Sequence, residues 1–278
     1  MIIFKQASQL TTYLLTQKKS GKKIGFVPTM GALHQGHLQL IEHANAGNDL
    51  TVCSIFVNPT QFNNPEDFQK YPKTLEKDIE LLIGAGCAIL FVPIKEEVYP
   101  ANYIPPHYDL GYLENILEGE HRPGHFQGVC QVVDLLLNIV KPDNLYLGQK
   151  DYQQCMVLTR LLEIRGSQEH LHFVPTKREA DGLAMSSRNL RLNESQRELA
   201  TAIYQVLKHL KENIQNLSIL DLQQAGRQQL EQKGFTVDYV AICHAETLEQ
   251  AHSTQVPLIG LIAASLDTIR LIDNERLN

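Results

Sequence analysis

Short apolar runs alternate with longer amphipathic segments over the first two thirds of the chain. The runs rich in β-branched and aromatic residues predict strands at 23–27, 50–57, 88–92, 144–147 and 171–175. The segments between them have helical periodicity and predict helices at 36–46, 74–83, 128–140 and 151–165. Almost unbroken apolar strands separated by helices are typical of a parallel sheet covered on both faces. The pattern therefore predicts an α/β domain with five strands.

The C-terminal part has a different pattern. Two polar amphipathic segments predict helices at 194–212 and 219–233, and an apolar run predicts a strand at 237–242. A hairpin is predicted to pair 258–264 with 268–272 across Ser265, Leu266 and Asp267. Helices followed by clustered strands are typical of a small α+β domain. We therefore predict a first domain at 1–176 and a second at 177–278, with the boundary near Thr176.

Composition narrows the possible functions. The 278 residues are 43% hydrophobic, which is enough for a substantial core and excludes a disordered chain. The formal net charge is −6, which argues against a protein that mainly covers nucleic-acid backbone. The longest run without a charged or polar side chain, at 81–94, is shorter than the roughly 18 residues that span a bilayer. We therefore expect a cytoplasmic protein that acts on small molecules, with no membrane or nucleic-acid partner.

The five cysteines are widely spaced and never form a Cys-x-x-Cys pair, which favours neither a disulfide framework nor a zinc site. They are interpreted as small apolar residues of the core.

The loop after the first predicted strand carries the first candidate chemistry. It has the sequence Pro-Thr-Met-Gly-Ala-Leu-His-Gln-Gly-His, from 28 to 37, and delivers His34 and His37 to a helix start. A helix start offers free backbone N–H groups and the positive end of the helix dipole, so the two imidazoles and these groups would form an anion site suited to phosphate. Alternatively, both are surface histidines beside a helix start. The arrangement resembles the HxGH signature of the nucleotidyltransferase and class I synthetase superfamily, which implies a Rossmann-like sheet.

The second predicted strand ends in Ile-Phe-Val-Asn-Pro-Thr-Gln-Phe, from 55 to 62. In a parallel sheet this exit lies on the same edge as the first one. The amides of Asn58 and Gln61 donate and accept hydrogen bonds without adding charge, which suits a substrate with hydroxyl and carboxylate groups. The alternative is that Asn58 and Pro59 only form a turn.

These two motifs together resemble the pantothenate synthetase (pantoate:β-alanine ligase) family. Three later segments also resemble family motifs, in the family's order. They are the Arg-Pro-Gly-His-Phe-Gln-Gly-Val segment at 122–129, Gly-Gln-Lys-Asp-Tyr-Gln-Gln at 148–154, and Asp-Gly-Leu-Ala-Met-Ser-Ser-Arg-Asn at 181–189. The resemblance implies ATP-dependent condensation of (R)-pantoate with β-alanine through a pantoyl adenylate, giving pantothenate, AMP and pyrophosphate. It also implies Mg²⁺ bound with ATP, no tightly bound organic cofactor, and a homodimer.

The resemblance implies roles for individual residues. His34, His37, Lys150 and Arg188 would be catalytic, and Gln61, Gln154, Asn58 and Met30 would bind pantoate and β-alanine. The implied ATP-binding residues are Met30, Gly31, Ala32, Leu33, His34, Gln35, Gly36, His37, Gly148, Gln149, Lys150, Asp151, Lys177, Met185, Ser186, Ser187 and Arg188. The metal ligands stay unknown.

Several of these positions have alternatives. Asp151 could be a helix cap, and Arg188 in a serine-rich loop could be solvated. Gln149 and Lys177 depart from the residues usual in the family, and Arg122 and His125 could either support the substrate site or only form a turn. For the whole chain, the alternatives are another HxGH enzyme, such as a dinucleotide-forming nucleotidyltransferase or an aminoacyl-tRNA synthetase, and a nucleotide-binding regulatory module without activity.

Overall fold

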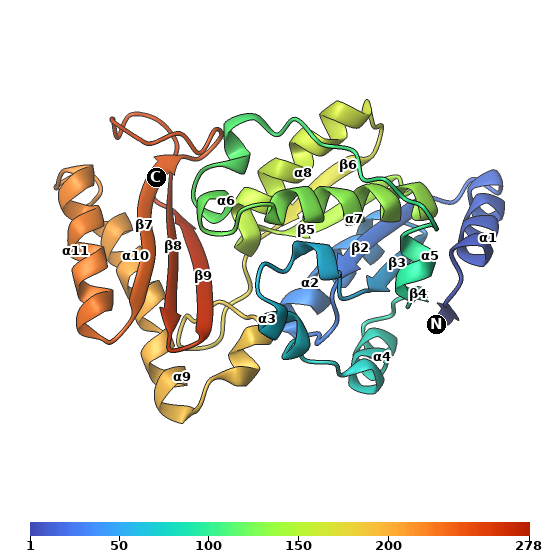
Figure 1. Ribbon diagram of the computed structural model, residues 1–278, viewed down its shortest axis with the longest axis horizontal. Coiled ribbons are helices and arrows are strands. Elements are labelled where there is room, and N and C mark those ends of the chain that lie inside the picture. Colours follow the sequence, from blue (N-terminus) through green and yellow to red (C-terminus); the bar gives the residue numbers. More distant parts are fainter. The chain divides into compact units, whose positions relative to one another are not determined.

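The computed structural model describes residues 1–278 and divides the chain into two compact units. The first unit comprises Met1–Gln149 and Gln154–Pro175, and the second comprises Lys150–Gln153 and Thr176–Asn278. Each unit has its own sheet (Figure 1). The short segment Lys150–Gln153 thus packs with the C-terminal residues, although it lies in sequence within the first unit.

The sheet of the first unit has six parallel strands in the order β1-β4-β3-β2-β5-β6. The strands are β1 (Ile2–Phe4), β2 (Ile24–Thr29), β3 (Leu50–Ile55), β4 (Ile89–Phe91), β5 (Asn144–Gly148) and β6 (His170–Val174). After β4 the chain returns to the other side of β2 to form β5. The exits of β2 and β5 therefore flank the point where the strand order reverses, which is where open α/β sheets bind ligands.

Helices cover both faces of this sheet. The longer ones are α1 (Ala7–Lys19), α2 (Gln35–Gly47), α4 (Leu75–Gly84), α7 (His125–Val140) and α8 (Tyr152–Arg165). The shorter ones are η1 (Pro59–Gln61), α3 (Pro65–Gln69), α5 (Lys95–Val98), η2 (Gly111–Glu114), α6 (Glu118–His121) and η3 (Gln149–Asp151). Ile41 of α2 and Leu82 of α4 share a buried cluster with Val27 and Leu90 of the sheet. Phe26 is also fully buried, and because strand side chains alternate, it points to the face opposite Val27.

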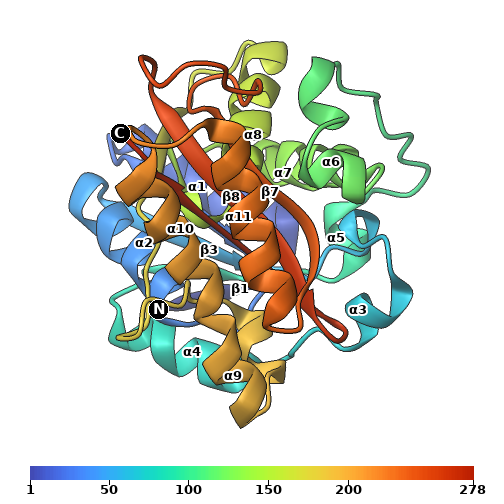
Figure 2. The ribbon, with the colours of Figure 1, turned by 90° about the vertical axis from the view of Figure 1, so that its left-hand side faces the viewer.

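The second unit is a three-stranded antiparallel sheet with helices. Its strands are β7 (Thr236–His244), β8 (Leu258–Leu266) and β9 (Ile269–Arg276), and its helical segments are η4 (Ser187–Arg191), α9 (Glu194–Ala200), α10 (Ala202–Asn213) and α11 (Ile219–Gln232). Figure 2 shows α10 and α11 side by side over this sheet, where Leu207, Leu222 and Ile262 join one buried core. The predicted α/β fold with a smaller α+β C-terminal part is confirmed.

Three differences from the sequence predictions concern the strands and the longer helices. Strand β1 and helix α1 were not predicted, so the sheet has six strands and not five. The helix predicted at 194–212 is interrupted at Thr201, which separates α9 from α10. The hairpin turn is shorter than predicted, because Ser265 and Leu266 belong to β8 and Leu266 pairs with Ile269.

Two further findings concern the rest of the chain. All five cysteines are free and buried, as the sequence predicted. No helix has the length and apolar character needed to cross a membrane.

Candidate active site

A buried carboxylate holds the loop that follows β2. Gly31 and Ala32 both have left-handed backbone angles, with φ of +83° and +50°. Asp78 of α4, which is 1% exposed, accepts hydrogen bonds from the backbone N–H of Ala32 at 2.9 Å and of Leu33 at 2.8 Å. The Thr74 hydroxyl donates a third bond to the same carboxylate at 3.0 Å. Because a left-handed alanine is unfavourable, these bonds stabilise a turn that fixes where α2 begins.

His34 and His37 form the N-terminal cap of α2. Nδ1 of His34 accepts a hydrogen bond from the N–H of Gly36 at 3.1 Å, and Nδ1 of His37 accepts one from the N–H of His34 at 3.2 Å. Their ring centroids are 4.0 Å apart. A nitrogen that accepts from a backbone N–H carries no proton, so each neutral imidazole carries its proton on Nε2. The capping bonds thus leave both histidines with an Nε2–H donor.

The expectation of free backbone N–H groups at this helix start is wrong for Gly36 and His37. The Gly36 N–H donates to the His34 ring, and the N–H groups of His37 and Leu38 donate to the His34 carbonyl. These backbone groups are satisfied within the helix cap. Hydrogen bonding to an anion would therefore come from the imidazoles, while the helix dipole adds a favourable field.

The structure brings together three of the residues predicted to bind substrate. The Gln61 amide lies at the end of η1, and its Nε2 donates to Sδ of Met30 at 3.4 Å. Its Oε1 accepts from Nδ2 of Asn58 at 3.1 Å. Asn58 is 1% exposed and also donates to the Gly128 carbonyl at 3.1 Å. A side chain on Gly128 would collide with the Thr60 carbonyl, so only glycine lets α7 approach η1 this closely.

Arg122 and His125 support the same loop from the other side. Nδ1–H of His125 donates to the Gln61 carbonyl at 2.8 Å, and Arg122 donates to the same oxygen at 3.4 Å. Arg122 also forms an ion pair with Glu118 at 3.5 Å. Of the two alternatives for this segment, the contacts favour support of the loop that carries Gln61, because both side chains hold the Gln61 backbone.

Lys150 and Arg188 belong to the second unit. Lys150 is largely covered, and its Nζ lies 3.8 Å from Oδ1 of Asp151. The Asn274 amide of β9 donates to the Lys150 carbonyl at 2.8 Å, which fixes the backbone of this segment. The predicted residues Gly148 and Gln149 lie in the first unit, at the end of β5 and the start of η3. Gln154, in the first turn of α8, is half-buried.

The Met185–Arg188 segment begins η4. Ser186 caps this short helix by accepting from the N–H of Arg188 at 3.3 Å, and Ser187 is buried. The Met185 N–H donates to the Lys177 carbonyl at 2.9 Å, while the Lys177 side chain is exposed. Position 177 therefore contributes to this loop through its backbone.

Arg178, which the sequence analysis missed, anchors this loop to β9. It donates to Oδ2 of Asp273 at 2.6 Å, to the Asn274 carbonyl at 3.0 Å and to the Gly182 carbonyl at 3.2 Å. Its guanidinium also lies over the Tyr204 ring, 4.3 Å from the centroid. Burial raises the pKa of Asp273, and the bond from Arg178 opposes that shift. Nothing in the sequence distinguished this arginine from Arg188, because its partners on β9 lie 95 and 96 residues away.

No cluster of three or more His, Cys, Asp or Glu side chains in the described chain has the geometry of a metal site. The buried carboxylate of Asp78 is engaged by the backbone of the loop after β2.

Comparison with known proteins shows which family the chain belongs to. Residues 2–276 match the model of the pantoate-beta-alanine ligase family. A pantothenate synthetase from Cytophaga hutchinsonii is 44% identical over 99% of this chain and 98% of the relative. The chain belongs to the pantoate-beta-alanine ligase family. The predicted family and the predicted ligase class are therefore confirmed.

Two solved members of the family have the same fold. A pantothenate synthetase from Thermus thermophilus superimposes with a TM-score of 0.94 at 40% identity, covering 100% of this chain and 99% of that one. A pantoate-beta-alanine ligase from Francisella tularensis, solved with an ATP compound and β-alanine, superimposes with a TM-score of 0.84 at 39% identity, covering 100% of this chain and 98% of that one. Family members in both comparisons span the two units.

Proposed function

We propose that this chain joins (R)-pantoate to β-alanine at the expense of ATP, through an enzyme-bound pantoyl adenylate. The observation that supports this most is the pair of Nε2–H donors of His34 and His37, which the capping bonds orient at the start of α2, after the exit of β2. Two imidazole donors suit a polyphosphate, and the neutral amide of Gln61, after the exit of the neighbouring strand β3, suits a hydroxy acid.

In the first step the pantoate carboxylate attacks the α-phosphorus of ATP. A bond forms between the carboxylate oxygen and phosphorus, and the bond to the bridging oxygen breaks, so pyrophosphate leaves with the electron pair. The carboxylate is already ionised at neutral pH, so no general base is required. The residues proposed for this step, His34, His37, Lys150 and Arg188, hold the phosphates in position and stabilise the charge that develops on them.

In the second step the amine of β-alanine attacks the acyl carbon of the adenylate. The bond to the phosphate oxygen breaks, AMP leaves, and the amine loses a proton as the amide forms. We propose that Gln61 and Gln154 hold pantoate through both steps. The side-chain oxygen Oε1 of Gln61 accepts a hydrogen bond from Nδ2 of Asn58. The Nε2–H of the same amide is therefore the group that would donate to a pantoate oxygen.

We propose that the Met185–Arg188 segment binds the triphosphate together with Lys150, and that Mg²⁺ enters as part of the ATP complex. Arg188 supplies a planar cation suited to two phosphate oxygens, and the Ser186 and Ser187 hydroxyls can donate hydrogen bonds. The backbones at Met30–His37 and at Gly148–Asp151 would complete the nucleotide site. Lys177 would contribute to it through its main chain, because its side chain is exposed.

The second unit would act as a lid over the ATP- and pantoate-binding first unit, because a reactive acyl adenylate must be shielded from water. Small-angle scattering with and without ATP plus pantoate tests this proposal. The radius of gyration is expected to fall when both ligands are present, and unchanged profiles would contradict a lid.

The decisive experiment is ATP–pyrophosphate exchange with (R)-pantoate and no β-alanine, followed by measurement of AMP release when β-alanine is added. Exchange with pantoate alone, and AMP release only with the amine, are the expected results. No exchange despite ATP binding would contradict pantoate as the acid substrate.

We also propose a homodimer that works in the cytoplasm, as the family resemblance implies. Light scattering coupled to size-exclusion chromatography is expected to give twice the chain mass of 31.4 kDa. A single-chain mass at micromolar concentration would contradict the dimer.

A further inference from the structure

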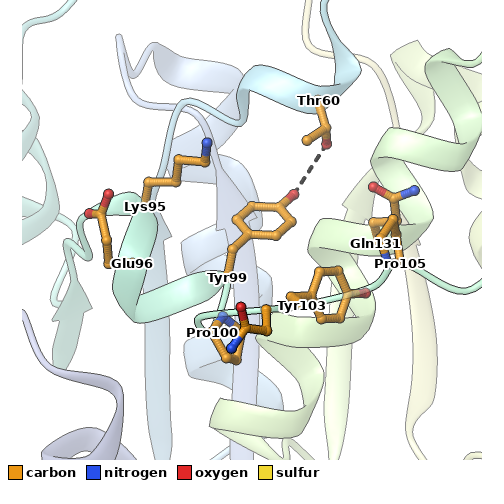
Figure 3. Close-up of a pocket in the computed structure, with 9 residues that line it drawn as sticks. Thr60, Lys95, Glu96, Tyr99, Pro100, Tyr103, Pro105 and Gln131 are labelled. Carbon is orange, nitrogen blue, oxygen red and sulfur yellow. Dashed lines mark hydrogen bonds between the residues drawn. The ribbon is translucent and has the colours of Figure 1, made fainter.

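A cavity of about 390 Å³ lies behind the loop that carries Gln61. Its lining includes Thr60 of η1, Lys95 of α5, Gln131 of α7, and Tyr99 and Tyr103 from the segment after α5. In Figure 3 the Tyr99 ring stands in the middle of this group with its hydroxyl pointing to Thr60. All these residues belong to the first unit.

Tyr99 is linked to the Gln61 side chain through one buried amide, that of Asn58. Its hydroxyl donates to Oδ1 of Asn58 at 2.7 Å and lies 3.1 Å from the Thr60 hydroxyl. Asn58 in turn donates from Nδ2 to Oε1 of Gln61. Burial raises the pKa of Tyr99, so its hydroxyl keeps its proton around neutral pH.

Backbone groups fix the orientation of the Asn58 amide. The Thr60 N–H can only donate, and it lies 3.4 Å from Oδ1, whereas the Gly128 carbonyl can only accept, and it lies 3.1 Å from Nδ2. Nδ2 therefore faces Gln61. Oδ1 also accepts from the Thr60 hydroxyl at 3.1 Å, so the 2.7 Å bond from Tyr99 is the shortest of the three contacts that hold this oxygen.

We propose that Tyr99 is a positioning residue for pantoate, which it acts on through Asn58 by keeping the Nε2–H of Gln61 directed at the substrate. The chain of contacts runs from Tyr99 to Asn58 to Gln61, and each link has one donor and one acceptor. Without the tyrosine hydroxyl, the Asn58 amide keeps its orientation but loses its shortest contact, so Asn58 holds the Gln61 amide less firmly. The Nε2–H of Gln61 would then be directed less well at a pantoate carboxylate or hydroxyl oxygen. This inference rests on the proposed role of Gln61.

The competing explanation is that Tyr99 only packs. Its ring lies 6.3 Å from the Phe56 ring and 5.7 Å from the Tyr103 ring. The variant Tyr99→Phe keeps these ring contacts and removes only the hydroxyl, so it separates packing from hydrogen bonding. Tyr103→Phe is the matched control, because Tyr103 lines the same cavity without a contact to Asn58.

The test is pantoate-dependent ATP–pyrophosphate exchange by the full chain. Tyr99→Phe is expected to raise the KM for pantoate about 3- to 10-fold, as the loss of one hydrogen bond would, with the KM for ATP unchanged and the melting temperature lowered by at most about 2 to 4 °C. Tyr103→Phe is expected to match the unchanged chain. In an Asn58→Ala background, Tyr99→Phe is expected to add nothing, because the link through Asn58 is already broken.

Gln61→Ala separates this inference from the proposed function. If Gln61→Ala raises the KM for pantoate and Tyr99→Phe does not, the positioning role is overturned while the Gln61 assignment stands. If Gln61→Ala has no effect, both are overturned. Equal rises in both KM values for Tyr99→Phe, or an undiminished effect in the Asn58→Ala background, would show a packing role and overturn the inference.

Discussion

The two units build their parts of the proposed site by different means. In the first unit, backbone groups and one buried carboxylate hold the loop after β2, and the histidines are helix caps. In the second unit, long cationic side chains hold the loop at η4, chiefly Arg178 on Asp273. Hydrogen bonds from the backbone fix the position and the tautomer of a histidine ring, whereas an ion pair joins a loop to a strand through a long, flexible side chain. The first arrangement therefore suits fixed donors, and the second suits a segment that moves.

The largest effect is expected from the anchor of the second unit. Arg178→Ala leaves the Asp273 carboxylate, 5% exposed, without its cationic partner. The free energy of unfolding is expected to fall by about 3 to 5 kcal/mol, as when one member of a buried ion pair is removed. Urea unfolding measures it. As a control, Arg178→Met combined with Asp273→Asn is expected to recover most of the loss, and no recovery would contradict an electrostatic cause.

The two nitrogens of His37 can be tested separately. His37→Asn keeps an acceptor near the position of Nδ1 but removes the Nε2–H donor, so we expect about a 100- to 1000-fold loss of exchange rate with little change in stability. His37→Gln keeps a donor near the position of Nε2 and loses the helix cap. We expect this variant to lower the free energy of unfolding by about 1 kcal/mol and to lose less of the exchange rate than His37→Asn does. Exchange rates and melting temperatures of both variants give the comparison. The opposite ranking in rate would contradict the role assigned to Nε2–H.

A smaller effect is expected at Asp78. Asp78→Asn places an N–H₂ group against a backbone N–H of Ala32 or Leu33, which is expected to destabilise the turn after β2 by about 1 to 3 kcal/mol. If this turn positions His34 for ATP, most of that loss of free energy is expected to be measured as a lower kcat/KM for ATP. Thr74→Val, which removes the side-chain bond and leaves the turn bonds in place, is the matched control. Equal kinetic losses in both variants would count against a specific role of the turn.

The smallest effect concerns the exposed pair of Arg197 and Asp181. The hydrogen bond from Arg197 lowers the pKa of Asp181, so the pair stabilises the fold above the ordinary carboxyl pKa near 4. This contribution is lost as the pH falls through the lowered pKa of the folded state. Because the pair is exposed, we expect it to stabilise by under about 1 kcal/mol. The melting-temperature gap between the unchanged chain and Asp181→Asn should narrow from pH 7 to pH 3, and a constant gap would rule out the ion pair.

The same contrast explains what could be predicted from the sequence. The strands β2 to β6 have strongly apolar runs, so their number and order along the chain were recognisable. Strand β1 has only three residues at the sheet edge, with Ile2 and Ile3 exposed, and such a run carries little periodic signal. At the site, the positions of His34 and Gln61 follow from strand exits and from family motifs. The sequence pattern alone also suggested that they could bind phosphate and substrate.

Partners distant in sequence could not be predicted. The bond from the Ala32 N–H to Asp78 joins residues 46 positions apart, and the bond from Arg178 to Asp273 joins residues 95 positions apart. Neither follows from periodicity or composition, because each depends on how the elements pack. The expectation of free N–H groups at the start of α2 was wrong because a side-chain orientation decides it. The Gly36 N–H donates to Nδ1 of His34, and the spacing of the residues does not determine how that ring is turned.

The burial of all five thiols has a practical consequence for measuring motion. Burial raises the pKa of Cys87 to about 11 and of Cys130 and Cys243 to about 12, so these side chains stay protonated and react poorly with maleimides. A cysteine introduced at the exposed Ile83 and another at the exposed Leu220 would then be the preferred sites for a pair of fluorophores. The native sequence is thereby suited to single-molecule energy transfer between its two units without prior removal of cysteines.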